Sequence, residues 1–160
     1  MKRKLIIFCT ILVVFAVILS HFMPDKNFSG LHDVTTALEN HGYQVAVQEA
    51  EKNILRGERY CLTLNHDSDF MVTVYVYDSN DQAEKDAASI TPDGFGIERE
   101  GSFGIAESMQ ISWVDAPHFF LYENMIVQYI GMDFDLLQCL YQLCGAQIAG
   151  QPFIDSPLID

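Results

Sequence analysis

Basic residues are scarce in this sequence. Nine Lys and Arg residues stand against 22 Asp and Glu residues in a chain of 160, which gives a formal net charge of −13. Three of the nine lie in residues 2–4, so the chain after residue 23 has six basic and 22 acidic residues, a net charge of −16. Because binding to nucleic-acid phosphates requires clustered Lys and Arg, we expect no nucleic-acid partner.

Several motifs of metal and cofactor sites are also missing. The four cysteines form no C-x-x-C pair, which argues against a zinc site. The glycine-rich residues 94–104 lack the Gly-Lys-Ser/Thr of a phosphate-binding loop. Residues 78–84 have the acidic and amide alternation of a calcium loop but no Gly at its sixth position. We therefore predict no metal and no cofactor.

Length and composition predict one globular domain behind a short leader. Hydrophobic residues make up 49% of the chain and charged residues 19%, a balance typical of a folded domain rather than a disordered one. We divide the chain into a membrane anchor or signal segment (1–23), a linker (24–30), an extracytoplasmic α+β domain (31–150) and a tail (151–160).

The leader has the features of a membrane anchor. Basic residues 2–4 precede an apolar run, 5–19, in which only Thr10 is polar. A helix reaching Met23 would extend roughly 28 Å, close to the hydrocarbon core of about 30 Å. The residues expected to contact lipid are Leu5, Ile6, Ile7, Phe8, Ile11, Leu12, Val13, Val14, Phe15, Val17, Ile18 and Leu19.

A cleaved secretory signal would share the basic start and the apolar run. The best small-residue cleavage site, residues 18–20, is a poor match, so both interpretations stay open and we favour the retained anchor. The positive-inside bias keeps residues 2–4 in the cytoplasm and places the chain after Pro24 outside it. The predicted location is therefore membrane-anchored and extracytoplasmic, or secreted if the leader is cleaved.

Hydrophobic periodicity predicts three helices and six strands in the domain. The predicted helices cover residues 31–41, 80–90 and 133–144, with a capping box at Ser79 before the second helix and with Gly42 and Gly145 after the helix ends. The predicted strands cover residues 43–47, 60–64, 70–77, 109–114, 117–122 and 125–130.

This order of elements predicts an α+β fold with an antiparallel sheet and helices packed on one face, preceded by the N-terminal hydrophobic helix. Both faces of strand 70–77 are apolar, which suggests a central strand. Residues 94–108 are expected to form a long irregular excursion. In the turn between the last two strands, Glu123 and Asn124, Asn is expected to take the positive φ.

Residues 86–94 (DAASITPDG), 112–120 (SWVDAPHFF) and 125–131 (MIVQYIG) carry a family resemblance. They resemble a group of small bacterial lipoprotein-like or membrane-anchored proteins of unknown function, over about residues 35–150. The resemblance implies a bacterial, extracytoplasmic setting and implies no activity. This chain has no cysteine at the end of its apolar run for lipid attachment, since Cys9 lies inside the run.

The domain contains three cysteines, Cys61, Cys139 and Cys144, and two of them could form a disulfide. An extracytoplasmic location permits one, but Cys139 and Cys144 are roughly 7.5 Å apart along one predicted helix and cannot pair with each other. A bridge would therefore join Cys61 to one of them, and we favour Cys144. The interpretation we favour over any bridge is three buried thiols that act as small hydrophobic side chains.

The candidate binding residues lie in the 94–104 loop and the 115–122 hairpin. His118 near Asp115 could serve as a base or ligand, or could be a structural histidine. Alternation puts Phe119 opposite Phe120, so one of these side chains can fill the core while the other meets a partner, or both can be core. The candidate binding residues are Phe95, Phe103, Asp115, His118 and Phe120.

Three hypotheses about function follow. The leading one is a non-enzymatic, membrane-tethered domain outside the cytoplasm that binds an unknown protein or cell-envelope partner. The second is a hydrolytic or thiol-based enzyme that uses His118 or Cys61, which requires a pocket joining one of them to a second ionisable group. The third is an acidic inhibitor of a basic envelope enzyme, which the net charge would fit.

Overall fold

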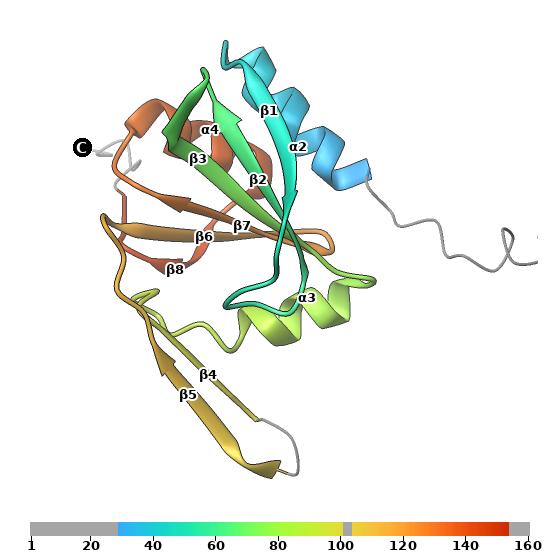
Figure 1. Ribbon diagram of the computed structural model, residues 1–160, viewed down its shortest axis with the longest axis vertical. Helices are drawn as coiled ribbons and strands as arrows, with labels where there is room; N and C mark the ends of the chain where they lie inside the picture. The colour runs from blue at the N-terminus through green and yellow to red at the C-terminus, as the bar shows by residue number, and fades with distance from the viewer. Residues whose placement is uncertain (1–28, 101–103, 154–160) are drawn as a thin grey trace, which may run out of the picture.

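The computed structural model describes residues 29–100 and 104–153, and its fold is α+β (Figure 1). The described helices are α2 (Ser29–Asn40), α3 (Asn80–Ala87) and α4 (Phe134–Cys144). The described strands are β1 (Val45–Ala50), β2 (Glu58–Leu64), β3 (Asp67–Val76), β4 (Gly96–Glu100), β5 (Ala106–Gln110), β6 (Pro117–Tyr122), β7 (Met125–Ile130) and β8 (Gln147–Gly150).

Six of these strands form one antiparallel sheet in the order β1-β2-β3-β7-β6-β8. The antiparallel sheet and the central position of β3 are confirmed. Strands β4 and β5 form a separate two-stranded sheet that projects from the body of the molecule as a hairpin, and Ile97 of β4 also forms a β-bridge with Ile90. The described chain thus has a sheet with two faces and one projecting hairpin.

Helices cover both faces of the sheet, so the prediction that they pack on one face is wrong. Helices α2 and α4 pack against the face that carries Val72, Val74 and Val76 of β3. Helix α3 contributes Ala83 to a second core with Tyr75. Because successive side chains of a strand point to opposite faces, the apolar residues on both sides of β3 each require cover.

Side-chain caps begin α3 and α4, and the cap of α3 was predicted from the sequence. The Ser79 side chain accepts a hydrogen bond from the backbone N–H of Gln82 at the start of α3 (3.4 Å). Asp133 accepts one from Leu136 at the start of α4 (2.8 Å). Helix α3 ends at Ala87, before the predicted residue 90, because the Ser89 hydroxyl and backbone N–H both bond to the Asp86 carbonyl and close a tight turn.

The predicted irregular excursion at residues 94–108 is wrong. The segment forms the β4–β5 hairpin, whose pairing runs from Gly96↔Gln110 to Glu100↔Ala106. Of the predicted strand at residues 109–114, only the first two residues are in a strand, at the end of β5. Every residue of β5 is exposed, so the hairpin lacks the apolar alternation that marks a half-buried strand.

Two smaller differences concern a turn and the last strand. The positive φ of the β6–β7 turn belongs to Glu123 (φ 50°), not to Asn124. Asn124 is buried instead, and its side-chain amide donates to the Tyr77 carbonyl. Strand β8, which the sequence analysis did not predict, pairs antiparallel with β6. It is only four residues long, too short to show a periodicity.

The predicted N-terminal hydrophobic helix, at residues 1–23, lies outside the described residues. Within the described ranges, none of the helices has the length and hydropathy needed to cross a membrane. Helix α2 begins at Ser29, so the last two residues of the predicted linker belong to this helix.

Candidate functional site

The predicted binding residues do not share one surface. Phe95 is half-buried, and Phe103 lies outside the described residues. Asp115 is exposed and accepts a hydrogen bond from the backbone N–H of Ala116 (2.7 Å). His118 and Phe120 have no exposed surface, so neither is available to contact a partner at the surface. Both side chains lie on the sheet face that α2 and α4 cover.

His118 has the environment of a structural histidine. Its ring is stacked on Tyr129 (centroids 6.2 Å apart), and its Nδ1 lies 3.0 Å from the Gln147 Oε1. Its Nε2 is buried without a hydrogen-bond partner in the described residues. The His118 ring thus bonds an amide, and the predicted partnership with Asp115 is not formed.

All three cysteines of the domain are free, so the predicted bridge between Cys61 and Cys144 is absent. Cys61 pairs with Thr73 across β2 and β3, and its side chain lies on the face opposite α4. Cys139, rather than Cys144, is the fully buried thiol of α4. Burial raises the pKa of Cys139 to about 11 and that of Cys144 to about 12, which keeps both as neutral thiols.

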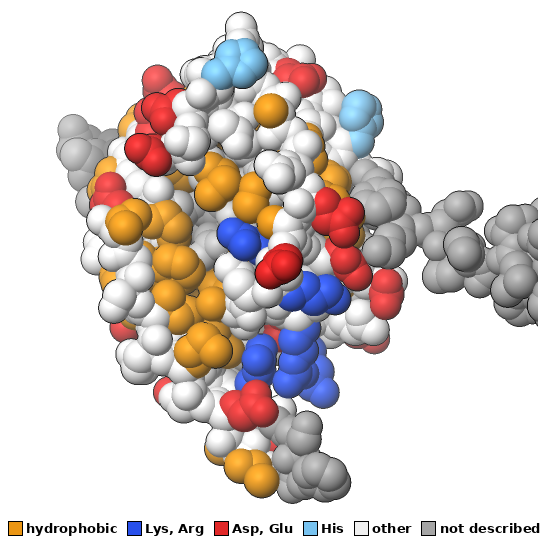
Figure 2. Space-filling view, in the orientation of Figure 1, with side chains coloured by type: hydrophobic (Ala, Val, Ile, Leu, Met, Phe, Trp, Pro, Cys, Tyr) orange, Lys and Arg blue, Asp and Glu red, His pale blue; other side chains and the backbone are white. Residues whose placement is uncertain are grey.

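The scarce basic side chains gather in one place. Figure 2 shows Lys and Arg side chains together on the face between the main sheet and the β4–β5 hairpin, beside an area of hydrophobic side chains. The basic residues of the described chain are Lys52, Arg56, Arg59, Lys85 and Arg99. Each belongs to the segment 51–59, contacts it, or shares a pocket with it. We call this set the basic cluster.

The loop between β1 and β2, residues 51–57, carries the centre of the basic cluster. Leu55 is buried beneath the loop with Tyr75 and Tyr77. A Cβ at Gly57 would lie 3.0 Å from the Tyr77 ring, so a larger residue there would require the loop or the ring to shift. Arg99 of β4 donates to the Ile54 carbonyl (3.3 Å) and ties the hairpin to the loop.

A buried carboxylate fixes the loop to helix α3. The Oδ2 of Asp86 accepts hydrogen bonds from the backbone N–H of Arg56 and from the Tyr77 hydroxyl, both at 2.6 Å. The Arg99 guanidinium lies 3.9 Å from the other oxygen of Asp86. Burial, followed by the hydrogen bond to Asp86, raises the pKa of Tyr77. The negative charge of Asp86 is therefore compensated from three sides.

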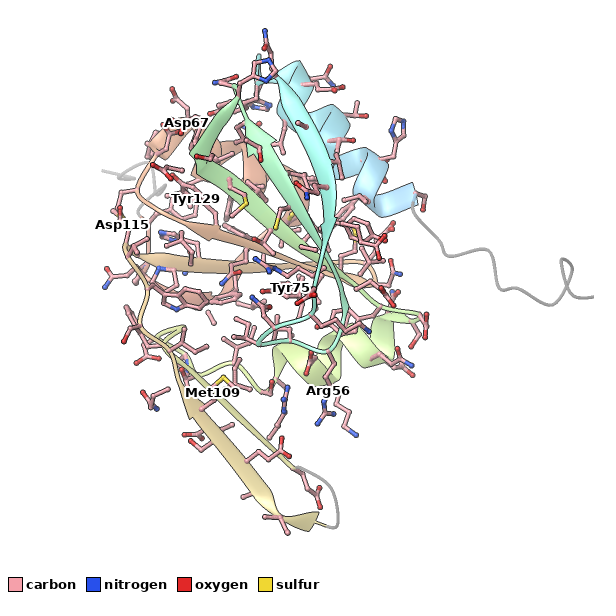
Figure 3. All side chains as sticks on the ribbon, in the orientation of Figure 1. Arg56, Asp67, Tyr75, Met109, Asp115 and Tyr129 are labelled. Atoms are coloured by element: carbon pink, nitrogen blue, oxygen red, sulfur yellow. The ribbon has the colours of Figure 1, made fainter. Side chains whose placement is uncertain are left out.

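A pocket of about 290 Å³ opens beside this carboxylate and is lined by Arg56, Tyr77, Gln82, Lys85 and Asp86. We call it the basic pocket. The Arg56 guanidinium makes one long bond, to the Glu100 carbonyl (3.4 Å), and Lys85 forms no ion pair within the described ranges. Asp115 lies away from Arg56, on the other side of the view in Figure 3.

A second polar group lies nearer the middle of the same sheet face. The Tyr75 hydroxyl is within hydrogen-bond distance of the Asn53 Oδ1 (2.9 Å) and the Gln128 Oε1 (3.2 Å). Burial raises the pKa of Tyr75 to about 12, although the positive charge of Arg59 acts to lower it. The Nε of Arg59 and the Nε2 of Gln128 are buried without hydrogen-bond partners in the described residues. This face is therefore rich in hydrogen-bond donors.

Comparison with protein-family models, curated proteins and solved structures finds no match to this chain. The site therefore has to be interpreted from its own geometry. No group of three or more His, Cys, Asp or Glu side chains within residues 29–100 and 104–153 is arranged to hold a metal ion.

The basic cluster was missed in the sequence analysis, although one signal was present. Three of the six basic residues after residue 23 fall at positions 52, 56 and 59. Because the rest of the chain is so acidic, this concentration of basic residues could have been noticed in the sequence. The contributions of Lys85 and Arg99 come from elements far away in the sequence, and only the fold brings them together.

Proposed function

We propose that the protein is a non-enzymatic, membrane-tethered domain outside the cytoplasm that binds a protein or cell-envelope partner through the basic cluster. The observation that carries the proposal is that every described Lys and Arg belongs to the segment 51–59, contacts it or shares a pocket with it, in a chain with a net charge of −13. Figure 2 shows Lys and Arg side chains together on this face. Such a distribution favours an anionic group on the partner and orients the partner toward that face.

Binding agrees better than catalysis with the environment of the candidate catalytic groups. His118 is fully enclosed, and its Nδ1 is engaged with Gln147. The thiols of α4 have raised pKa values, which disfavours the nucleophilic thiolate. Cys61 lies on the face of the basic cluster, and within the described residues no hydrogen bond joins it to an ionisable side chain that could act as its base.

The proposal is tested by photo-crosslinking in intact cells. A photoreactive amino acid at Gln82, in the basic pocket, is expected to trap an envelope partner, whereas the same group at the exposed His32 of α2 is not. Protease added to intact spheroplasts should digest the domain. Equal adducts from both positions would contradict the assigned face, and a protected domain would contradict the location.

A further inference from the structure

We propose that the basic pocket binds a phosphoryl group. The inference deepens the proposed function, because it names the chemistry that the basic cluster recognises on the partner. The observation that carries it is that Arg56 and Lys85, two cationic side chains without carboxylate partners among the described residues, line one pocket together with the Gln82 amide.

The charges around the pocket favour an anion despite the acidity of the chain. Two other cations of the basic cluster pair with carboxylates, Lys52 with Glu58 at 3.5 Å and Arg99 with Glu107 at 3.2 Å. The fifth, Arg59, donates to the Glu51 carbonyl (3.4 Å) and does not line the pocket. The one carboxylate in the pocket wall, Asp86, already holds two short hydrogen bonds and faces Arg99. The side chains of Arg56 and Lys85 therefore have charge left for a ligand.

The donor set fits a phosphoryl group better than a carboxylate. A guanidinium offers a planar fork that bonds two oxygens, and an ammonium supplies a point charge for a third. The Gln82 amide adds a neutral donor. A carboxylate has only two oxygens and would leave part of this set unused. The pocket, at about 290 Å³, accommodates a phosphate monoester.

The position of the Arg56 side chain makes the proposal testable without unfolding the loop. The structural bond to Asp86 comes from the backbone N–H of Arg56, and the guanidinium is at the exposed end of the residue. Arg56→Gln therefore removes the charge and keeps the anchor. Lys85→Gln also removes one positive charge from the pocket, at an exposed position on α3. Lys52→Gln is the matched control, because it removes an equal charge outside the pocket.

The experiment is a titration of the full-length, 15N-labelled protein in detergent micelles, followed by backbone amide shifts. The probes are inorganic phosphate and glycerol 3-phosphate, with acetate at the same ionic strength. We expect saturable shifts at Gln82 and Lys85, and at least tenfold weaker binding of acetate. Arg56→Gln and Lys85→Gln should each weaken phosphate binding about tenfold, and Lys52→Gln should leave it unchanged.

The two phosphate probes distinguish the sources of the group. Tighter binding of the ester supports the site and points to a phosphorylated partner, and tighter binding of inorganic phosphate supports the site and points to the free anion. Shifts without saturation, equal binding of acetate, or unchanged binding in the double variant would overturn the phosphoryl site. If the Gln82 crosslink persists after such a result, the proposed function stands and only this inference fails.

Discussion

At the scale of single residues, Asp86 links the structure to the proposed site. Its carboxylate joins helix α3, the 51–57 loop and the β4–β5 hairpin through Arg56, Tyr77 and Arg99. A buried carboxylate is costly unless donors compensate it, and its removal leaves those donors unpaired. Asp86 therefore positions the basic pocket even though its own charge is unsuited to an anionic ligand.

Replacement of this carboxylate should destabilise the fold. Asp86→Asn keeps the size of the side chain but removes the charge that faces Arg99 and weakens the two short hydrogen bonds. We expect the free energy of unfolding to fall by about 2–4 kcal/mol in urea denaturation. Glu84→Gln, at an exposed position on the same helix, should change it by less than about 0.5 kcal/mol. Equal effects of both substitutions would contradict the role of Asp86.

Residue-scale predictions from sequence succeeded where the signal was local. Ser79 caps its helix as predicted, because a cap depends on a side chain and a backbone N–H three residues away. Two side-chain pairings that the sequence left open were not found: His118 with Asp115, three residues apart, and Cys61 with Cys144, far apart in the chain. Whether such residues meet depends on which face of the sheet each occupies, and residue spacing does not determine that.

At the scale of elements, strand β8 depends on a glycine. Gly150 lies opposite His118 on β6 with φ 109°, and a Cβ there would collide with the backbone carbonyl of Pro117. Its backbone N–H also donates to the Pro92 carbonyl (2.9 Å). The edge of the sheet and the segment after α3 are thus joined at a position that admits no side chain.

The chain offers a matched pair that separates backbone strain from collision. Gly42 has a similar φ of 92° but open space around it, so Gly42→Ala should cost only the left-handed strain, about 1–2 kcal/mol. Gly150→Ala adds the collision, and we expect a further loss of about 1–3 kcal/mol in the free energy of unfolding by urea. Equal losses for the two variants would contradict this prediction, because they would show that β8 can shift away from the Pro117 carbonyl without cost.

Strands that are buried in the core were easier to predict from the sequence than strands that are exposed. Strands β6 and β7 were predicted with their observed bounds, since both are rich in apolar and aromatic residues around a two-residue turn. The hairpin of β4 and β5 was missed because charged and small residues dominate it. The hairpin is held by the pairing of its two strands and by the hydrogen bond from Arg99 to the 51–57 loop. The sequence pattern of the hairpin shows neither interaction.

At the scale of the whole molecule, helices pack on both faces of the sheet, and buried tyrosines therefore lie in two separate cores. Tyr43 lies against the α2 and α4 face, and Tyr75 and Tyr77 lie in the core with α3. Burial raises the pKa of Tyr43 and of Tyr75 to about 12. The apolar surface on both sides of β3 was predictable from sequence, whereas the assignment of each helix to a face was not.

These shifts predict a loss of stability in alkali. The folded state keeps the phenolic protons that the unfolded chain releases near pH 10, so the free energy of unfolding should fall as the pH rises from 10 to 12. The thiols of α4 add to this loss from about pH 9. Tyr75→Phe should reduce the slope by up to about 1.4 kcal/mol per pH unit in urea denaturation. A slope equal to that of the wild type would contradict the assigned burial effect.

The described chain begins and ends on opposite sides of the molecule: α2 starts at one side of Figure 1 and β8 lies toward the other. A fusion partner joined behind β8 would therefore stand away from any support that holds the first helix. For a chain immobilised by its leader, a fluorescent reporter at that distal end can be read without blocking the support.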